Sequence, residues 1–323
     1  MTSSTVTHVS AAPPTRPAAL ARGVLAYTVF VILFGAVVRI TGSGAGCGQH
    51  WPSCNGEIVH LPRKLETVIE LTHRVTSGGA LFAVLWFALV AWRGFPTGDR
   101  VRTVATAAVA LMIVEALIGA ALVLFRWVGG DASVGRALVM PLHLVSTYAL
   151  TAVLTLGVYF TAPARRGEAL GSGDSPVPRW AFWAVALVLV LVSATGALTA
   201  LGDTVAPPSA GSLSERLLED HGAGATFLQR LRIVHPVLAV LGALGVARLA
   251  LYFAGDTEPA ARRSPARAVL GFAAVQLVAG VANVWLSAPG WLQIVHLGLA
   301  LGLWISYVAL TANALANARP NTA

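Results

Sequence analysis

Charged residues are scarce in this chain of 323 residues: they make up 11% of it, whereas hydrophobic residues make up 56%. Soluble domains carry about a quarter charged residues, so this composition excludes an ordinary soluble fold. Disorder requires low hydrophobicity, and two cysteines are too few for a disulfide-dense secreted scaffold. A nucleic-acid-binding domain needs a basic surface, which so apolar a chain does not offer. The mean hydropathy of +0.73 indicates a polytopic membrane protein.

Nucleotide-binding motifs are also missing. The glycine-rich stretch Gly42–Gly46 is followed by neither a phosphate-binding helix nor a lysine, so we predict a turn there. The sequence contains no flavin or nicotinamide motif. Any electrons that the protein uses must therefore come from a separate donor.

Apolar runs dominate what is present. A membrane-spanning helix needs roughly 20 apolar residues, and eight segments meet that length. We therefore predict an all-α polytopic membrane protein of eight transmembrane helices joined by short, polar connectors. The predicted spans are Leu20–Ile40, Val68–Trp92, Val101–Phe125, Leu138–Phe160, Trp180–Leu201, Leu228–Phe253, Ala266–Leu286 and Trp291–Leu315.

The distribution of charge sets the predicted orientation. With the N-terminus inside, most of the 22 basic residues lie on the cytoplasmic side and most acidic residues lie outside. We therefore expect both termini in the cytoplasm and the first loop outside. Arginine supplies every basic residue except Lys64, a usage that suggests a GC-rich bacterial genome and hence a bacterial plasma membrane.

An internal repeat divides the chain into two halves of four spans each. The halves share one orientation, and short connectors favour up-and-down bundles, so we predict two pseudo-symmetric four-helix bundles. The aligned pairs are residues 114–121 with 275–282 and Gly35 with Gly196 at an offset of 161, His73 with His235 at 162, and His143 with His296 at 153.

The repeat also sets the predicted domain boundaries. The predicted regions are a disordered cytoplasmic tail at 1–19, an N-terminal four-helix bundle at 20–160, a cytoplasmic linker at 161–179, a C-terminal four-helix bundle at 180–315 and a cytoplasmic tail at 316–323.

Four histidines lie one in each even-numbered span, roughly two helical turns from the outer end. Polar side chains in hydrocarbon are costly and usually face the bundle interior. Two histidines that face each other in a bundle can bind haem iron as axial ligands. We predict that His73 and His143 form one haem site and that His235 and His296 form the other. Zinc or copper is a weaker alternative, because each half supplies only two imidazoles.

The two halves differ beside the first histidine of each. Glu70 lies three residues before His73, and its counterpart in the repeat is Arg232. A carboxylate there can position a proton, hold a water or bind substrate; the alternative is a salt bridge with Arg74 or Arg63. The arginine can pair with a haem propionate. We therefore expect the N-terminal half to be the reactive site, with Glu70 and the two histidines catalytic, and the C-terminal half to hold a stable cofactor.

A second acidic side chain, Glu115, lies inside the third span, opposite Gln276 in the repeat. A structural hydrogen bond across helices and a place in a proton path are both open for it.

Cys47 and Cys54 are the only cysteines, and both lie on the first external loop. The oxidising exterior and the short, flexible spacing favour a disulfide. A metal site that adds His50 is the alternative.

Three short stretches resemble haem A synthase, the membrane enzyme of cytochrome oxidase assembly: Thr41–Cys47, Trp51–Gly56 and Glu70–Arg74. The resemblance covers all eight spans and the four histidines. It implies oxidation of the C8 methyl of haem O to a formyl group by successive hydroxylations, which gives haem A. A bound haem b would transfer electrons. The resemblance implies His235 and His296 as haem b ligands, His73 and His143 as contacts of the substrate haem, Glu70 as an essential carboxylate, and Cys47 and Cys54 as an external disulfide.

The resemblance also implies partners. Haem O carries a long isoprenoid tail and can enter the site laterally from the lipid. A complex with the farnesyltransferase that produces haem O is a further hypothesis. The leading rival is a dihaem electron-transfer protein of the cytochrome b type, which explains four histidines but not Glu70. A transporter or haem exporter is disfavoured, because Pro141 and Pro236 lie near helix ends rather than at the midplane.

Overall fold

The computed structural model describes residues 16–58, 61–165, 169–170, 175–209 and 211–317, and long helices account for most of them. Eight helical stretches are long and apolar enough to cross a membrane, which confirms the predicted all-α polytopic fold. The helices are α1 (Arg16–Ile40), α2 (Leu65–Gly94), α3 (Arg100–Leu124), α4 (Val134–Thr161), α5 (Arg179–Val205), α8 (Val234–Leu251), α9 (Ala260–Trp285) and α10 (Gly290–Ala314). The stretch that includes α8 begins earlier, at Phe227, in α7 (Phe227–Arg230) and the short helix η3 (Leu231–Ile233).

The long helices are mainly apolar, as helices surrounded by lipid and other helices must be. Polar residues mark where several of them begin. The Asp99 side chain accepts a hydrogen bond from the backbone N–H of Val101 and caps α3. Ser133 caps α4 in the same way through the N–H of Arg136. These caps satisfy backbone donors that lack a partner within the helix.

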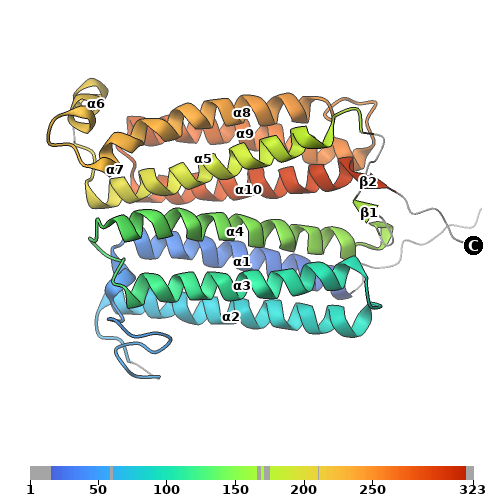
Figure 1. Cartoon of the computed structure of the whole chain (residues 1–323), viewed down its shortest axis with the longest axis horizontal. Coiled ribbons are helices and arrows are strands. Elements are labelled where there is room, and N and C mark those ends of the chain that lie inside the picture. The colour runs from blue at the N-terminus through green and yellow to red at the C-terminus, as the bar shows by residue number, and fades with distance from the viewer. Residues whose placement is uncertain (1–15, 59–60, 166–168, 171–174, 210, 318–323) are drawn as a thin grey trace, which may run out of the picture.

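The eight helices form two groups of four (Figure 1). In the first group, α1 packs on α2 and α4, and α3 packs on the same two helices, which closes a ring. In the second group, α8 and α10 each pack on both α5 and α9. The groups meet where α4 packs against α5 and α10, and where α1 packs against α10. Each half is thus a four-helix bundle, whereas the pseudo-symmetry between the halves stays a prediction.

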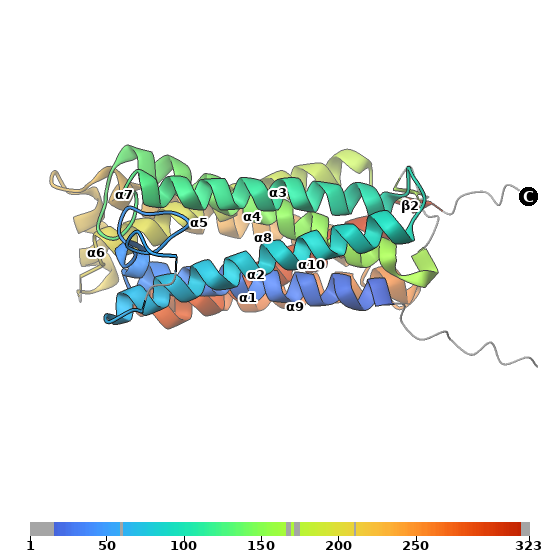
Figure 2. The same cartoon turned by 90° about the horizontal axis from the view of Figure 1, so that it is seen from below.

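The connections gather at two opposite ends of the molecule (Figures 1 and 2). The cysteine loop, which contains the short helix η1 (Ser43–Ala45), lies at the same end as α6 (Leu213–His221) and α7. At the other end α1 begins and α10 ends. There the short helix η2 (Pro163–Arg165) is followed by strand β1 (Ala169–Leu170), which pairs antiparallel with β2 (Ala316–Asn317).

Parts of the predicted tails and linker lie outside the described residues: 1–15, 166–168, 171–174 and 318–323. The described part of the predicted N-terminal tail, from Arg16 onward, belongs to α1.

The connection between α5 and α8 corrects the expectation of short connectors. It contains α6, which begins at a capping box: the Ser212 hydroxyl accepts from the N–H of Glu215, and the Glu215 carboxylate accepts from the N–H of Ser212. This hydrogen bond lowers the pKa of Glu215. The Ser-x-x-Glu spacing was visible in the sequence as a helix start. Because it contains this helix start, the connection folds into α6 instead of running directly from α5 to α8.

Arg39, at the end of α1, links the two bundles. Its guanidinium donates to the carbonyl of Ala200 at 2.9 Å and to the hydroxyl of Thr204 at 2.7 Å, both on α5. It also donates to the Gln293 side chain on α10 at 2.7 Å. One side chain of the N-terminal half thus joins two helices of the C-terminal half.

Within the first bundle, close approach of α1 and α2 depends on a glycine. The Tyr27 hydroxyl on α1 donates to the carbonyl of Thr76 at 3.1 Å. It lies over Gly79, where an added Cβ would come within 2.7 Å of the Tyr27 oxygen. The adjacent Gly78 has no atom within 4 Å of such a Cβ.

We predict opposite effects for alanine at these neighbouring positions. Gly79→Ala must displace Tyr27 and should lower the free energy of unfolding by about 1–3 kcal/mol. Gly78→Ala only restricts the unfolded chain and should raise the free energy of unfolding by up to about 1 kcal/mol. Thermal unfolding of the detergent-solubilised variants measures both. Equal midpoints for the two variants would contradict this account of the packing of α1 on α2.

Candidate functional site

The two histidines of the C-terminal bundle face each other. The ring centres of His235 on α8 and His296 on α10 lie 6.3 Å apart, with the rings nearly perpendicular at 87°. An imidazole nitrogen binds a metal at about 2 Å, so two imidazoles on opposite sides of one metal have ring centres about 6 Å apart. His235 also has its Nδ1 3.0 Å from the carbonyl oxygen of Val192, which leaves its Nε2 available. The pair therefore fits two axial ligands of one haem.

Glycines on neighbouring helices lie against three of the four histidine rings. A Cβ added at any of these positions would approach the ring Cε1 closely: 3.1 Å for Gly35 and His73, 3.0 Å for Gly196 and His235, and 3.3 Å for Gly280 and His296. The first two contacts match under the internal repeat. The alignment already paired these glycines, but which side chain they face becomes visible only in three dimensions.

The histidines of the N-terminal bundle have different surroundings. His73 on α2 packs near the ring of Phe34, with ring centres 6.1 Å apart. His143 contacts an acidic side chain: its Nδ1 lies 2.8 Å from a carboxylate oxygen of Glu115 on α3. Gly119, the repeat counterpart of Gly280, has no side chain against it.

The surroundings favour haem over a bare metal ion. Among the described residues, no three histidine, cysteine, aspartate or glutamate side chains come together as a metal site. Two imidazoles alone leave most positions around a metal unfilled, whereas a macrocycle supplies the others. All four histidines are half-buried within the bundles. Haem b at His235 and His296 stays a prediction that this geometry fits.

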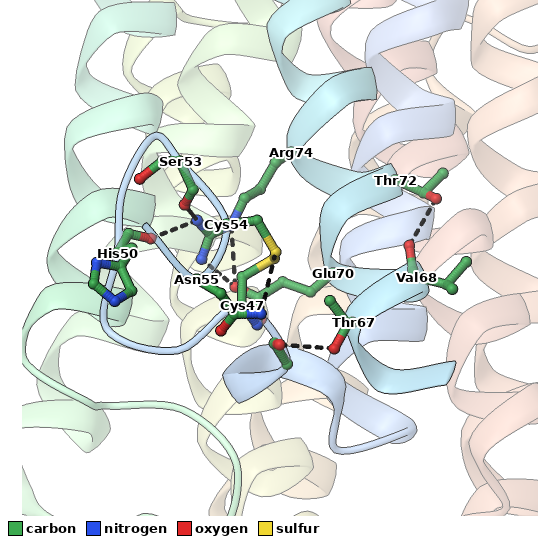
Figure 3. The surroundings of a disulfide bond; sticks show 11 residues. Cys47, His50, Ser53, Cys54, Asn55, Thr67, Val68, Glu70, Thr72 and Arg74 are labelled. Atoms are coloured by element: carbon green, nitrogen blue, oxygen red, sulfur yellow. Dashed lines mark hydrogen bonds and ion pairs between the residues drawn. A yellow bond between two sulfur atoms is a disulfide. The ribbon is translucent and has the colours of Figure 1, made fainter. Parts of the chain in front are cut away.

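Glu70 lies under the cysteine loop (Figure 3). The residue is only 3% exposed, and its carboxylate accepts the backbone N–H of Cys47 at 2.7 Å. The other carboxylate oxygen forms an ion pair with Arg74, one turn further along α2. The salt bridge considered from the sequence is therefore present, with Arg74 as the partner. A catalytic role of Glu70 stays a prediction.

Arg74 holds the loop from the other side. Its guanidinium donates to the carbonyls of His50 at 2.5 Å and Ser53 at 2.6 Å (Figure 3). The predicted disulfide between Cys47 and Cys54 is confirmed, and both cysteines are buried. Because both sulfurs are bonded to each other, the alternative metal site with His50 is wrong.

The start of the loop is also fixed to α2. The Thr67 hydroxyl donates to the carbonyl of Gly46 at 2.8 Å. A Cβ at Gly46 would lie 2.5 Å from the carbonyl oxygen of Glu66, so only glycine allows the backbones to approach this closely. The loop thus covers the N-terminal end of α2, where Thr67 and Glu70 lie six and three residues before His73.

Arg232 lies between two carboxylates. It pairs with Asp203 at the end of α5, at 3.0 Å, and with Asp220 of α6, at 2.7 Å. It also donates to the backbone carbonyl of Gly202 at 3.1 Å. Sequence reasoning missed both acids, because only the folding of the α5–α8 connection over the bundle brings Asp220 to the arginine. The predicted contact of Arg232 with a haem propionate stays a prediction.

We predict that Arg74→Gln releases the loop. The change leaves the buried Glu70 carboxylate without its ion pair, which costs about 1–3 kcal/mol. The cysteines are 0% and 1% exposed, so a reductant reaches the disulfide only when the loop opens. Reduction by dithiothreitol, followed by thiol alkylation, should be about tenfold faster or more. The exposed Arg63→Gln is the control, and an unchanged rate in Arg74→Gln would show that the arginine does not hold the loop.

Comparison with known proteins adds three similar relatives. The chain is 43% identical to a protein of Thermus thermophilus named protoheme IX farnesyltransferase over 305 aligned residues. These residues make up 93% of this chain and 48% of the relative. A heme A synthase of Staphylococcus saprophyticus is 34% identical over 170 residues, 52% of this chain and 54% of the relative. One from Bacillus cereus is 41% identical over 97 residues, 30% of this chain and 31% of the relative.

These matches span about half or less of each relative's length, so the names of the relatives describe proteins that this chain matches only in part. The match to the family described as cytochrome oxidase assembly protein is broader and extends over residues 18–308, which includes all four membrane histidines and the cysteine loop. The chain belongs to the cytochrome oxidase assembly protein family.

Proposed function

We propose that this protein is a haem A synthase, which oxidises the C8 methyl of haem O to a formyl group by successive hydroxylations. The observation that carries the proposal is the pair of facing imidazoles, His235 and His296, in a member of the cytochrome oxidase assembly family. Relatives named heme A synthase support the same activity. The product, haem A, would serve the assembly of cytochrome oxidase.

The two bundles would divide the work. His235 and His296 would hold haem b, which supplies electron transfer that side chains lack. His73 and His143 would contact the substrate haem O in the N-terminal bundle. Contacts of α4 with α5 and α10 join the two bundles directly. Electrons would come from a separate donor, as the sequence predicts.

The cysteine loop would close the reactive site. Glu70 and Arg74 hold this loop against α2, which is also the helix that carries His73. The carboxylate of Glu70 would act at the substrate from this position, and the loop would limit the access of water. Arg232 would hold the corresponding region of the C-terminal bundle through Asp203 and Asp220, and would lie beside the haem b propionates.

Location and partners follow from the same proposal. The protein would lie in a bacterial plasma membrane with both termini in the cytoplasm and the cysteine loop outside. The farnesyl tail of haem O would enter from the lipid. The Thermus thermophilus relative is named for farnesyl transfer, and about half of its length lies outside the match. That arrangement supports an association between this protein and a haem O synthase.

A dihaem electron carrier is the second candidate, because the facing histidines fit it equally well. It differs in one respect that can be tested: a carrier leaves the bound haem chemically unchanged.

Pigment analysis tests the proposal. Protein purified from cells that make haem O should contain haem b together with haem A or hydroxylated haem O, as resolved by reversed-phase chromatography. We predict that Glu70→Ala removes the oxidised products, by at least about tenfold, and keeps haem b. His235→Ala should lose haem b.

Two outcomes would contradict the proposal. Unmodified haem b alone in every variant, despite abundant haem O, would favour the electron carrier. The second outcome comes from expressing this protein in cells that lack haem O synthase. If haem O appears in those cells, this chain itself transfers the farnesyl group. Glu66→Gln, an exposed acid one turn before Glu70, is the matched control and should keep the oxidised products.

A further inference from the structure

The second histidine of each bundle contacts a side chain from the preceding membrane-spanning helix. In the N-terminal bundle, Nδ1 of His143 lies 2.8 Å from a carboxylate oxygen of Glu115. In the C-terminal bundle, Nε2 of His296 lies 3.2 Å from the amide nitrogen of Gln276. Glu115 and Gln276 are counterparts in the repeat. The two halves therefore place an acid and an amide at the same position, but against different nitrogens of the ring.

The acid is held in place by its surroundings. The hydroxyl of Ser146 contacts one oxygen of the Glu115 carboxylate, and the hydroxyl of Thr147 lies 3.2 Å from the other. Both residues lie on α4, within about one turn of His143. At the offset that aligns the histidines, the C-terminal bundle has Leu299 and Ala300 instead. The oriented carboxylate thus belongs to the N-terminal bundle alone.

Burial strengthens the hydrogen bond between Glu115 and His143. The Glu115 side chain is 13% exposed and the His143 side chain 31% exposed, inside a bundle of apolar helices. A hydrogen bond to a carboxylate is stronger than one to a neutral acceptor, more so where water is excluded. A metal-binding histidine that donates its other N–H to a carboxylate becomes a more basic ligand with a fixed ring orientation.

We propose that Glu115 is the positioning residue of the N-terminal haem site: it orients His143 through Nδ1 and makes it a stronger electron donor than its counterpart His296. This inference rests on the proposed function. Contact at Nδ1 leaves Nε2 of His143 free to meet the iron. Gln276 instead contacts the Nε2 of His296 and carries no charge, so it gives no such support. The reactive haem would then have a lower reduction potential than it has with a neutral partner on His143.

A redox titration of the full-length protein, reconstituted with haem b as the probe, tests this assignment. Two reduction waves should appear, and the wave that His296→Ala removes belongs to the C-terminal haem. We predict that Glu115→Gln raises the potential of the other wave, leaves the C-terminal wave in place, and weakens haem binding in the N-terminal bundle by about 10- to 100-fold. Glu115→Asp, which keeps a carboxylate, should restore part of the shift.

Further variants keep the inference testable if Glu115→Gln fails to fold. Ser146→Ala combined with Thr147→Val keeps the acid but removes the hydroxyls that orient it. This variant should shift the same wave in the same direction by a smaller amount. Gln276→Ala is the matched control and should leave the N-terminal wave unchanged.

The experiment distinguishes failure of the proposed function from failure of the role of Glu115. A single wave in the wild-type protein that disappears in His296→Ala would overturn the proposed second haem site, and with it the proposed function. Two waves that Glu115→Gln leaves unmoved would overturn only the role of Glu115. An equal shift in the potentials of both waves would show a general structural effect and would also overturn the role of Glu115.

Discussion

An imidazole inside a membrane-spanning bundle needs a polar partner or a ligand, because hydrocarbon supplies neither. This constraint acts on α2, α4, α8 and α10, each of which carries one membrane histidine. Where His235 and His296 face each other at 6.3 Å, neither ring satisfies the other as a plain hydrogen-bond partner, and the separation fits a metal between them. Gly196 and Gly280 lie against these two rings and leave room for them between the helices.

The two bundles solve the same problem with different polar groups. The C-terminal bundle uses a backbone carbonyl, that of Val192, against His235 and fixes Arg232 between two acids. The N-terminal bundle instead places carboxylates near its site, Glu115 against His143 and Glu70 beneath the disulfide loop. In the C-terminal bundle the acids pair with an arginine, whereas in the N-terminal bundle the Glu115 carboxylate contacts a membrane histidine directly, as expected of a group that takes part in chemistry.

Much of this was predictable from sequence, and the exceptions share one cause. Hydropathy predicted the eight spans, the histidines in the even-numbered spans predicted the facing pair His235 and His296, and the spacing of the two cysteines predicted the disulfide, because all three depend on one-dimensional patterns. The contact of Glu115 with His143 depends on how α3 and α4 rotate against each other, which no spacing rule states. The partners of Arg232 depend on α6, whose capping box was readable while its place over the bundle was not. The Arg74 partner of Glu70 was foreseen, but its hold on the loop carbonyls was not.

The central claim is that one pair of histidines in each bundle binds haem as axial ligands. Electron paramagnetic resonance of the full-length protein loaded with haem b tests it most directly. The account predicts low-spin signals of two-histidine ligation from two haems, of which His296→Ala removes one and His73→Ala removes the other. A spectrum that is high-spin throughout, or one that neither His296→Ala nor His73→Ala changes, would contradict the account.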